Sequence, residues 1–381
     1  MGIRDREGTP YGRIVTAIVW LLAGAWLIGG SAAAEAMDGQ SVGVGLAFSS
    51  VYDDNVLRYS KEQLALFESG LMPDPFSIET SDDLLLGPSA SLTWSNVMAR
   101  RRTRSLRLRW TGKFHKKDAT ADFSSYSALW RESFSRDRRL TLSGYWLPSF
   151  YLRQLFDEDA VPPFPGLSKY RRAEFDLGIG SVSWRQRIAG KTRAEIGYQY
   201  EHRAYNPEFE ERTSGTHQGE LGLEVYRLPR RGTLDFYGGY RKSNAKGADA
   251  DSAPDPDVSY HGIIAGLGWR MELARQKGWR LGADLGYELG TRAYDSKLPS
   301  DRYHYNRKDT SNTIDAALRW GCPHWLVRGF YRFDMNSTNL GAVAPPGSEA
   351  GSYKQNQVGL SLEWSGAIWR QSNGTGDAGE E

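Results

Sequence analysis

Strict alternation of apolar and polar side chains is the feature that most narrows the possible folds of this sequence. Near the C-terminus, Val358, Leu360, Leu362 and Trp364 occupy every second position, and polar residues or glycine stand between them. A repeat of two places the two sets on opposite faces of a β-strand. The same pattern recurs along the chain, so the sequence predicts an all-β fold in which each strand has one apolar and one polar face.

Fourteen segments with this pattern follow one another, and the connections between them alternate between short and long. The expected strands lie in residues 42–48, 86–94, 106–114, 126–134, 140–146, 173–179, 194–200, 221–225, 234–240, 263–271, 279–289, 314–320, 325–333 and 358–364. Several reach the roughly 9–11 residues that a tilted strand needs to cross the hydrocarbon of a membrane. An even strand number, with short turns at one end and longer loops at the other, is typical of antiparallel up-and-down membrane barrels.

The polar face distinguishes this barrel from the alternative, a soluble protein made of two packed β-sheets. Charged residues of both signs stand in the middle of the expected strands, where a wet lumen allows them to pair across strands. The residues expected to line the lumen and set its selectivity are Arg107, Arg109, Arg193, Glu195, Glu220, Glu224, Asp284, Glu288, Arg319 and Arg328. We therefore expect the polar face to point into a barrel and the apolar face to point toward lipid.

Tryptophans support the same orientation because eight of them fall on the apolar face. Several stand near the ends of expected strands, as an aromatic girdle at the two membrane interfaces requires. The expected girdle residues are Trp94, Trp110, Trp146, Trp269, Trp279, Trp320, Trp325 and Trp364.

The N-terminal residues have the character of an export signal. Arg4, Arg6 and Arg13 precede an apolar run over residues 14–30, and Ala34 and Ala36 fit a small-residue cleavage site. We expect residues 1–36 to be a signal peptide; an uncleaved membrane anchor is the alternative, because the run is long for a signal. No later segment reaches the roughly 18 apolar residues of a spanning helix. The single cysteine, Cys322, can form no intramolecular disulfide.

Together these features resemble the bacterial outer-membrane β-barrel superfamily. The resemblance rests on the export signal, the amphipathic hairpins, the aromatic girdle and the closing motif polar-x-Gly-x-x-apolar-x-aromatic in residues 357–364. It implies a barrel over residues 37–370 in the outer membrane, with short periplasmic turns, contact with outer-membrane lipid, and recognition of residues 357–364 by the barrel-assembly machinery. The chain departs from the pattern because residues follow the closing aromatic. We expect Trp364 to end the wall, or the strand to continue to Trp369, and residues 371–381 to form a disordered tail.

The long first loop, residues 53–83, is expected to contain a short helix. Ser60 and Gln63 have capping-box spacing, and Gly70 is placed to end a helix over Lys61 to Ser69. Three apolar side chains of this helix need burial: Leu64, Leu66 and Phe67. Since a 14-stranded lumen is too wide for wall side chains to fill, we expect this loop to plug or constrict the barrel.

Residue patterns for catalysis or metal binding are weak. Some barrels of this superfamily are enzymes, and the chain has six histidines: His115, His202, His217, His261, His304 and His324. No hydrolase motif surrounds any of them, so we expect no enzyme. Two acidic clusters lack the spacing of a calcium site and are interpreted as solvated loops: Asp53-Asp54-Asn55, and Asp249, Asp251, Asp255 and Asp257. We expect no metal and no cofactor, and the net charge of +2 indicates no nucleic-acid partner.

The leading hypothesis from the sequence is a channel that passes small polar solutes through a lumen of mixed charge. Two alternatives stay open: a barrel enzyme that acts on envelope lipid or protein, and a structural or export component of an envelope machine, such as one that secretes polysaccharide. The sequence specifies neither the solute nor the oligomeric state.

Overall fold

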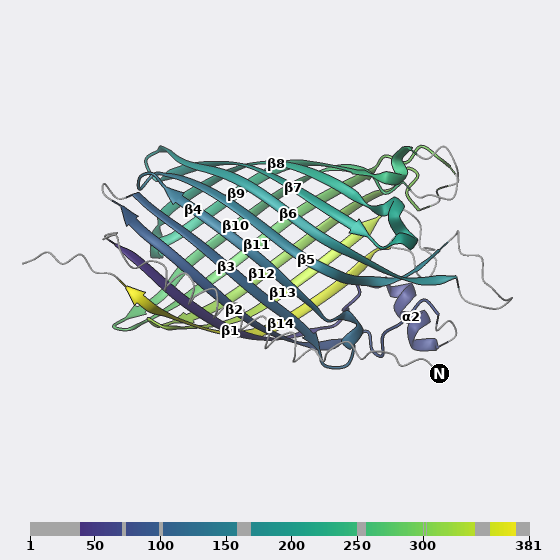
Figure 1. The fold of residues 1–381 in the computed structure, drawn as a ribbon, viewed down its shortest axis with the longest axis horizontal. Helices are drawn as coiled ribbons and strands as arrows, with labels where there is room; N and C mark the ends of the chain where they lie inside the picture. The colour runs from purple at the N-terminus through teal and green to yellow at the C-terminus, as the bar shows by residue number, and fades with distance from the viewer. Residues whose placement is uncertain are drawn as a thin grey trace, which may run out of the picture.

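The alternating segments form strands that close into one barrel in the computed structural model (Figure 1). The structure describes residues 39–70, 74–98, 102–157, 169–249, 257–299, 301, 303–339 and 351–370. Its strands are β1 (Gln40–Asp53), β2 (Asp83–Met98), β3 (Arg102–His115), β4 (Phe123–Ser133), β5 (Arg138–Phe156), β6 (Tyr170–Ala189), β7 (Thr192–Tyr205), β8 (Ser214–Leu228), β9 (Gly232–Ala245), β10 (Tyr260–Gln276), β11 (Trp279–Tyr294), β12 (Lys308–Gly321), β13 (Trp325–Thr338) and β14 (Tyr353–Arg370).

Each strand pairs antiparallel with its neighbours in sequence, and β1 also pairs with β14. The expected antiparallel barrel of about 14 strands is therefore confirmed, and the two-sheet alternative is wrong. The short connections meet at one end of the barrel, here called the turn end. The longer ones meet at the other, the loop end, which lies at the right in Figure 1.

Five short helices lie in the connections of the described chain. They are α2 (Lys61–Ser69), η2 (Ala119–Ala121), η3 (Pro207–Arg212), η4 (Pro229–Arg231) and η5 (Lys246–Asp249). Within the described residues, no helix has both the length and the apolar character needed to cross a membrane.

The first and last strands form the seam of the barrel. Leu46 lies opposite Trp364 and Phe48 opposite Leu362, as the alternation predicts. Of the two expected ends of the wall, Trp364 was wrong and continuation to Trp369 is confirmed, because β14 extends to Arg370, which pairs with Ser41. Residues 365–370 thereby cover the first residues of β1, whose backbone would otherwise be an unpaired edge. The expected tail, residues 371–381, lies outside the described residues.

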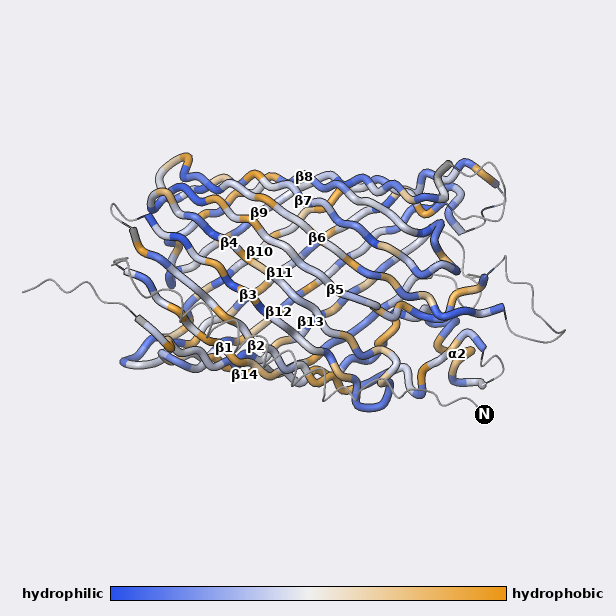
Figure 2. Tube along the Cα trace, viewed as in Figure 1, coloured by the Kyte–Doolittle hydropathy of each residue, from blue (hydrophilic) through white to orange (hydrophobic). Residues whose placement is uncertain are grey.

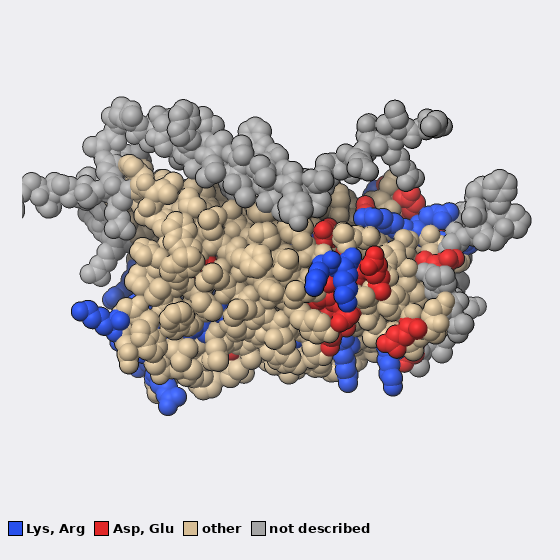
Figure 3. All heavy atoms as spheres, turned by 90° about the horizontal axis from the view of Figure 1, so that it is seen from below, with Lys and Arg blue, Asp and Glu red and all other residues tan. Residues whose placement is uncertain are grey.

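Apolar side chains cover the outer surface of the wall. Leu142, Ile196, Leu221, Leu285 and Leu360 are all exposed there, and the colours in Figure 2 alternate along many strands. On the face seen in Figure 3, charged side chains gather toward the two ends and leave a broad, nearly uncharged zone between them. An apolar belt between charged ends is what a barrel surrounded by hydrocarbon requires.

The apolar residues of the expected strand 173–179, which are Ala173, Phe175, Leu177 and Ile179, were expected to face lipid, but in β6 this orientation is reversed. Ala173 and Phe175 face inward and are 0% and 7% exposed, whereas Val182, further along the strand, is exposed on the outer surface. Phe175 packs against Phe150 inside the wall, with 5.3 Å between ring centroids. Because β-strand parity is continuous, the outward position at this level falls to Asp176, which accepts a hydrogen bond from the Ser149 backbone N–H.

Candidate functional site

Side-chain contacts that bridge non-adjacent strands identify the inner wall. Arg109 of β3 places Nη2 3.8 Å from Oε1 of Glu363 in β14, although β2 and β1 lie between these strands. The two side chains reach each other over small residues of the intervening strands, among them Gly45 and Ser91. The polar faces of these strands therefore point into the barrel.

A group of ion pairs joins β6, β7 and β8 in the lumen. Arg185 donates from Nε to Glu195 at 2.6 Å and from Nη1 to Glu224 at 2.8 Å. Arg193 donates to the second oxygen of Glu224 at 2.6 Å. Glu224 is only 8% exposed, and charge-assisted hydrogen bonds to both oxygens compensate its loss of water. A cavity of about 500 Å³ adjoins this group, and its lining includes five of the predicted lumen residues: Arg193, Glu195, Glu220, Glu224 and Glu288, although Asp235 and Arg270 also line it.

Carboxylates further round the wall have partners as well. Arg319 of β12 lies 2.7 Å from Asp284 of β11. Tyr237 of β9 donates to Glu288 of β11 at 2.5 Å and spans β10. Glu220 accepts a hydrogen bond from the Gln218 side chain of its own strand. These contacts make the inner face of β6–β13 a surface on which most charges are locally neutralised.

The remaining predicted lumen residues have weaker contacts. Arg107 donates from Nε to the hydroxyl of Thr93 at 3.1 Å. The Arg328 guanidinium lies 4.9 Å from the ring centroid of Phe330. The structure brings Arg193, Glu195 and Glu224 into one group, Asp284 and Arg319 into another, and does not join these sets to Arg107 and Arg109.

Four charged residues of the inner face were not among the predicted lumen residues: Arg185, Asp235, Arg270 and Arg332. The alternation had placed Asp235 and Arg332 on the polar faces of their strands, and Arg332 lies 2.9 Å from Asp334. Arg270 pairs with Asp235 at 3.0 Å. The signal for Arg185 was available, since Val182 and Trp184 fix the apolar parity of β6 and place Arg185 on the opposite face. Its pairing with Glu195 and Glu224 could not be predicted from the sequence, because it depends on the register of three strands.

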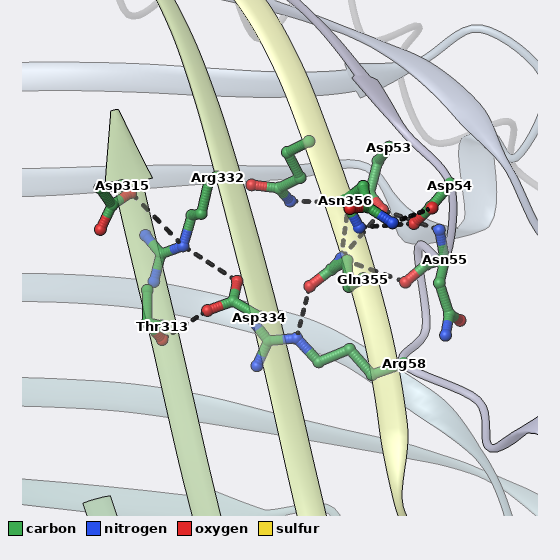
Figure 4. Close-up of polar contacts among 11 residues, drawn as sticks. Asp53, Asp54, Asn55, Arg58, Thr313, Asp315, Arg332, Asp334, Gln355 and Asn356 are labelled. Atoms are coloured by element: carbon green, nitrogen blue, oxygen red, sulfur yellow. Dashed lines mark hydrogen bonds and ion pairs between the residues drawn. The ribbon is translucent and has the colours of Figure 1, made fainter. Parts of the chain in front are cut away.

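At the loop end the seam carries a dense group of hydrogen bonds, drawn in Figure 4. Gln355 Nε2 of β14 donates to both carboxylate oxygens of Asp53, at 2.9 and 2.7 Å. Asn356 donates to Asp54 from its backbone N–H at 2.6 Å and from its side-chain amide at 2.7 Å. Asn55 donates to the Lys354 carbonyl at 2.9 Å. Asp53 and Asn55 are 3% and 2% exposed, so the interpretation of this acidic cluster as solvated was wrong.

The first loop contains the helix at the residues where it was expected. Ser60 accepts a hydrogen bond from the Gln63 backbone N–H at 3.2 Å, and the Gln63 side chain accepts one from the Ser60 N–H at 3.0 Å. Gly70 ends the helix with φ of +64°, a left-handed conformation that costs glycine little. The signal was local, which is why sequence alone found it.

The first loop lies at the loop end of the barrel and contacts two separate strands there. Arg58 contacts Gln355 of β14 through Nε at 3.1 Å, while the Leu57 carbonyl accepts a 2.5 Å hydrogen bond from Arg153 of β5. Leu57 and Tyr59 belong to a buried apolar cluster with Ile78, Ala121 and Tyr151, and Leu64 and Phe67 of α2 pack against it. Burial raises the pKa of the Tyr59 phenol.

In Figure 1, α2 lies at the loop end beyond the barrel wall. The loop is thus anchored to strands that are five positions apart in the wall.

The predicted girdle tryptophans differ in exposure. Trp146, Trp269, Trp320 and Trp325 are 52%, 42%, 51% and 46% exposed on the outer surface, and Trp325 pairs directly with Trp364. Trp94 stacks on Trp130, which was not among the predicted set. Trp279 opens β11 at the turn end. Trp110 lies opposite the exposed Tyr126 but is itself only 3% exposed.

Three of the histidines are paired with carboxylates near the loop end. His115, His261 and His304 place Nδ1 at 3.3, 2.7 and 2.9 Å from Asp122, Asp295 and Asp301 respectively. Burial lowers the pKa of His304, although its hydrogen bond to Asp301 opposes the shift. Among the described residues, no hydrogen bond joins a histidine ring to a serine or cysteine side chain, and no group of three or more His, Cys, Asp or Glu residues is arranged to hold a metal ion.

No protein-family model matches this chain, and no curated protein matches it either. Solved structures with which it can be aligned include the outer-membrane channel DcaP of Acinetobacter baumannii, at 11% identity over 87% of this chain and 99% of that chain, with a TM-score of 0.43. An anion-selective porin from Comamonas acidovorans aligns at 12% identity over 86% and 100%, with a TM-score of 0.40. A bacterial polysaccharide outer membrane secretin aligns at 8% identity over 85% and 98%, with a TM-score of 0.38. These likenesses are too distant to assign a family or a function.

Proposed function

We propose that this protein is an outer-membrane channel through which small polar solutes diffuse. The observation that carries the proposal is the closed wall of 14 strands whose apolar face is exposed and whose polar face points inward. For 14 strands spaced by about 4.8 Å and tilted by about 40°, the wall is roughly 28 Å across between backbones. Side chains from the wall cannot fill that width, so an aqueous path remains.

The outer surface supports placement in a lipid bilayer. Most tryptophans of the strands, although not Trp110, lie in the turn-end half, and Trp320 and Trp325 flank the turn between β12 and β13. Tyrosines lie further toward the loop end, where Tyr52, Tyr287 and Tyr331 donate to Asp82, Asn312 and Asn356. Two aromatic rows that bound an apolar belt fit the two interfaces of a membrane. In this arrangement the turn end faces the periplasm and the loop end faces outward.

Delivery to the membrane belongs to the same proposal. Residues 1–36, which lie outside the described residues, are the export signal, and residues 357–364 are the segment recognised by the barrel-assembly machinery. The second assignment is supported by the position of this segment in the closing strand, where it pairs with β1.

The first loop acts in this proposal as the constriction of the channel. It is held at both sides of the mouth, by Gln355 in β14 and Arg153 in β5, and its apolar cluster gives it a fixed shape. The predicted lumen residues, with Arg185 and Arg270, set the charge that a solute meets below it.

Swelling of liposomes that contain the purified protein tests this function. With uncharged sugars of increasing size, we expect rapid swelling for the smallest and progressively slower swelling for larger ones, because a fixed mouth sieves by size. Removal of residues 56–81 should admit larger sugars. Liposomes that swell no faster than protein-free ones with the full chain and with this deletion would rule out a diffusion channel.

A further inference from the structure

We infer that the preferred solutes are small oxyanions, which carry carboxylate or phosphate groups and move along a column of cations on the inner face of β3–β5. The inference rests on the proposed channel function and names the substrate class of the same lumen. The column, here called the cation ladder, consists of Lys113, Arg109, Arg107, Arg131 and Arg139.

Strand register arranges these residues in consecutive rows. Lys113, Arg109 and Arg107 share the inner face of β3. Arg131 of β4 lies opposite Ser105, the next inward position of β3 after Arg107. Arg139 of β5 lies opposite Ser133, the next inward position of β4 after Arg131. From Lys113 to Arg139 there are six inward rows, and all but the row of Thr111 carry a cation.

The spacing of the rows suits transfer of an anion from one cation to the next. Each row is about 6.8 Å from its neighbour along the strand, so the ladder extends over about 34 Å of strand length. Long arginine side chains reach a solute between two rows, and the planar guanidinium can hold a carboxylate or phosphate with two hydrogen bonds. Several sites of moderate strength allow an anion both to enter and to leave.

The ladder differs from the network of β6, β7 and β8 because most of its charges have no ion-pair partner among the described residues. Among the described residues, Arg107, Lys113, Arg131 and Arg139 have no carboxylate within ion-pair distance, and Arg109 has one, Glu363, at 3.8 Å. Carboxylates are nearly absent from β1–β5, where the acidic residues are Asp53, Asp83 and Glu132. Asp53 and Asp83 lie at the loop end, and Glu132 pairs with Arg102 and Arg104 on the opposite face of the wall.

Small residues beside the ladder leave room for the solute. The inner face of β1 and β2 consists largely of serine, glycine and alanine, with Ala47 opposite Ser89 and Gly45 opposite Ser91. Ser41 and Ser95 hydrogen-bond to each other at 2.7 Å. Short side chains protrude little into the lumen, and hydroxyls give an anion additional donors. On the other side, by contrast, Arg185, Arg193 and Arg319 are each engaged by a carboxylate, although Arg328 of β13 contacts the ring of Phe330 instead.

Reversal potentials across a planar bilayer test the inference. With the full chain in a KCl gradient, we expect chloride to permeate roughly threefold or more faster than potassium, because fixed positive charge concentrates anions. Millimolar succinate or phosphate should then reduce the chloride current by occupying the ladder. The triple variant R107Q/R109Q/R131Q should bring the permeability ratio to about one and abolish the block. A matched control that removes three exposed cations outside the ladder, K242Q/K277Q/K308Q, should keep the ratio and the block.

The outcomes separate the inference from the proposed function. Stepwise conductance with a preference for potassium would overturn the cation ladder and leave the channel intact. Absence of any conductance would overturn the channel itself. If the triple variant does not fold, the ratio and the succinate block measured with the unaltered chain decide alone: a ratio near one without block contradicts the inference.

Discussion

The side-chain amide of Gln355 donates to both carboxylate oxygens of Asp53, at 2.9 and 2.7 Å. These hydrogen bonds join the end of the first strand to the start of the last. Asp53 also accepts a hydrogen bond from Gln357 at 2.7 Å and one from the Asn55 backbone N–H at 2.9 Å. A single buried carboxylate thereby satisfies donors from both sides of the seam.

Replacement of Asp53 by alanine should weaken the closed barrel. The change removes the acceptor of the Gln357 amide and of the Asn55 backbone N–H, and it leaves the buried Gln355 amide with only the Asn55 carbonyl at 3.1 Å. An unsatisfied buried group costs about 1–3 kcal/mol. Urea unfolding in detergent micelles, followed by tryptophan fluorescence, should show a midpoint lowered accordingly. Glu68→Ala, on the exposed side of α2, is the control and should leave the midpoint unchanged. Equal midpoints for the two variants would contradict the role of Asp53 at the seam.

The capping box should determine the order of the first loop without affecting the barrel. Ser60→Ala removes the acceptor for the Gln63 N–H and should cost α2 about 1 kcal/mol. Amide hydrogen exchange in Lys61–Ser69 should accelerate by roughly fivefold, while exchange in β1 and β14 stays as it was. Ser69→Ala, at the other end of the helix, serves as comparison. Unaltered exchange in the helix would mean that the cap does not stabilise it.

Acid should loosen the loop that contains Asp301 and His304, between β11 and β12. Burial lowers the pKa of His304 below its ordinary value of about 6.5, so the folded loop favours the neutral ring. Burial of Asp301 acts to raise its pKa, but hydrogen bonds from His304 outweigh this and lower it. The stability that each group contributes is complete above its unfolded pKa and is lost as pH falls, first for His304 below about 6.5 and then for Asp301 below about 3.9.

Hydrogen exchange measured at pH 7.5 and at pH 5, and corrected for intrinsic rates, checks this dependence. We expect the amides of His304 and Arg307, which bond to the Asp301 and His304 carbonyls, to lose protection at pH 5. His304→Gln should reduce the difference between the two pH values. Equal protection at both pH values in the unaltered chain would show that protonation of His304 does not open the loop.

Neutralising Glu224 should increase anion preference. Glu224 pairs with Arg185 and Arg193, so Glu224→Gln releases positive charge into the lumen. A unit charge about 4 Å from a solute in water contributes on the order of 1 kcal/mol before screening. The chloride-to-potassium permeability ratio should therefore rise by roughly twofold to fivefold, in the direction opposite to loss of the cation ladder. A fall in the ratio would contradict the placement of this network along the permeation path.

Most of the architecture follows from sequence because strand period, turn position and helix caps are local signals. The alternation of apolar and polar residues around Leu46 and around Trp364 can be read directly from the sequence. Ser60, Gln63 and Gly70 mark the two ends of α2 within one short stretch of chain. The orientation of Ala173 and Phe175 was missed because apolar residues alternate with a period of two both within the lipid-facing belt and beyond it at the loop end. The period alone does not show which face points outward. The actual end of β14 at Arg370 depends on a partner, β1, that is more than 300 residues away.

The lumen could be predicted only in part. Arg193, Glu195 and Glu224 were found as inward charges, since parity alone identifies them. Their pairing with Arg185 depends on strand register and on the closure of the barrel, and so does the absence of such partners for Arg131 and Arg139 among the described residues. The burial of Asp53 likewise depends on a contact between the two ends of the chain.

Single-channel recording with a cysteine placed inside or outside the wall tests most directly whether solutes pass through this lumen. In a Cys322→Ser background, Ala47→Cys puts a thiol on the inner face of β1, and Leu46→Cys puts one on the exposed outer face. A charged methanethiosulfonate reagent should reduce the conductance of the Ala47→Cys protein in discrete steps and leave the Leu46→Cys protein unaffected. Equal block of both proteins, or of neither despite complete labelling of Ala47→Cys, would contradict conduction through the barrel.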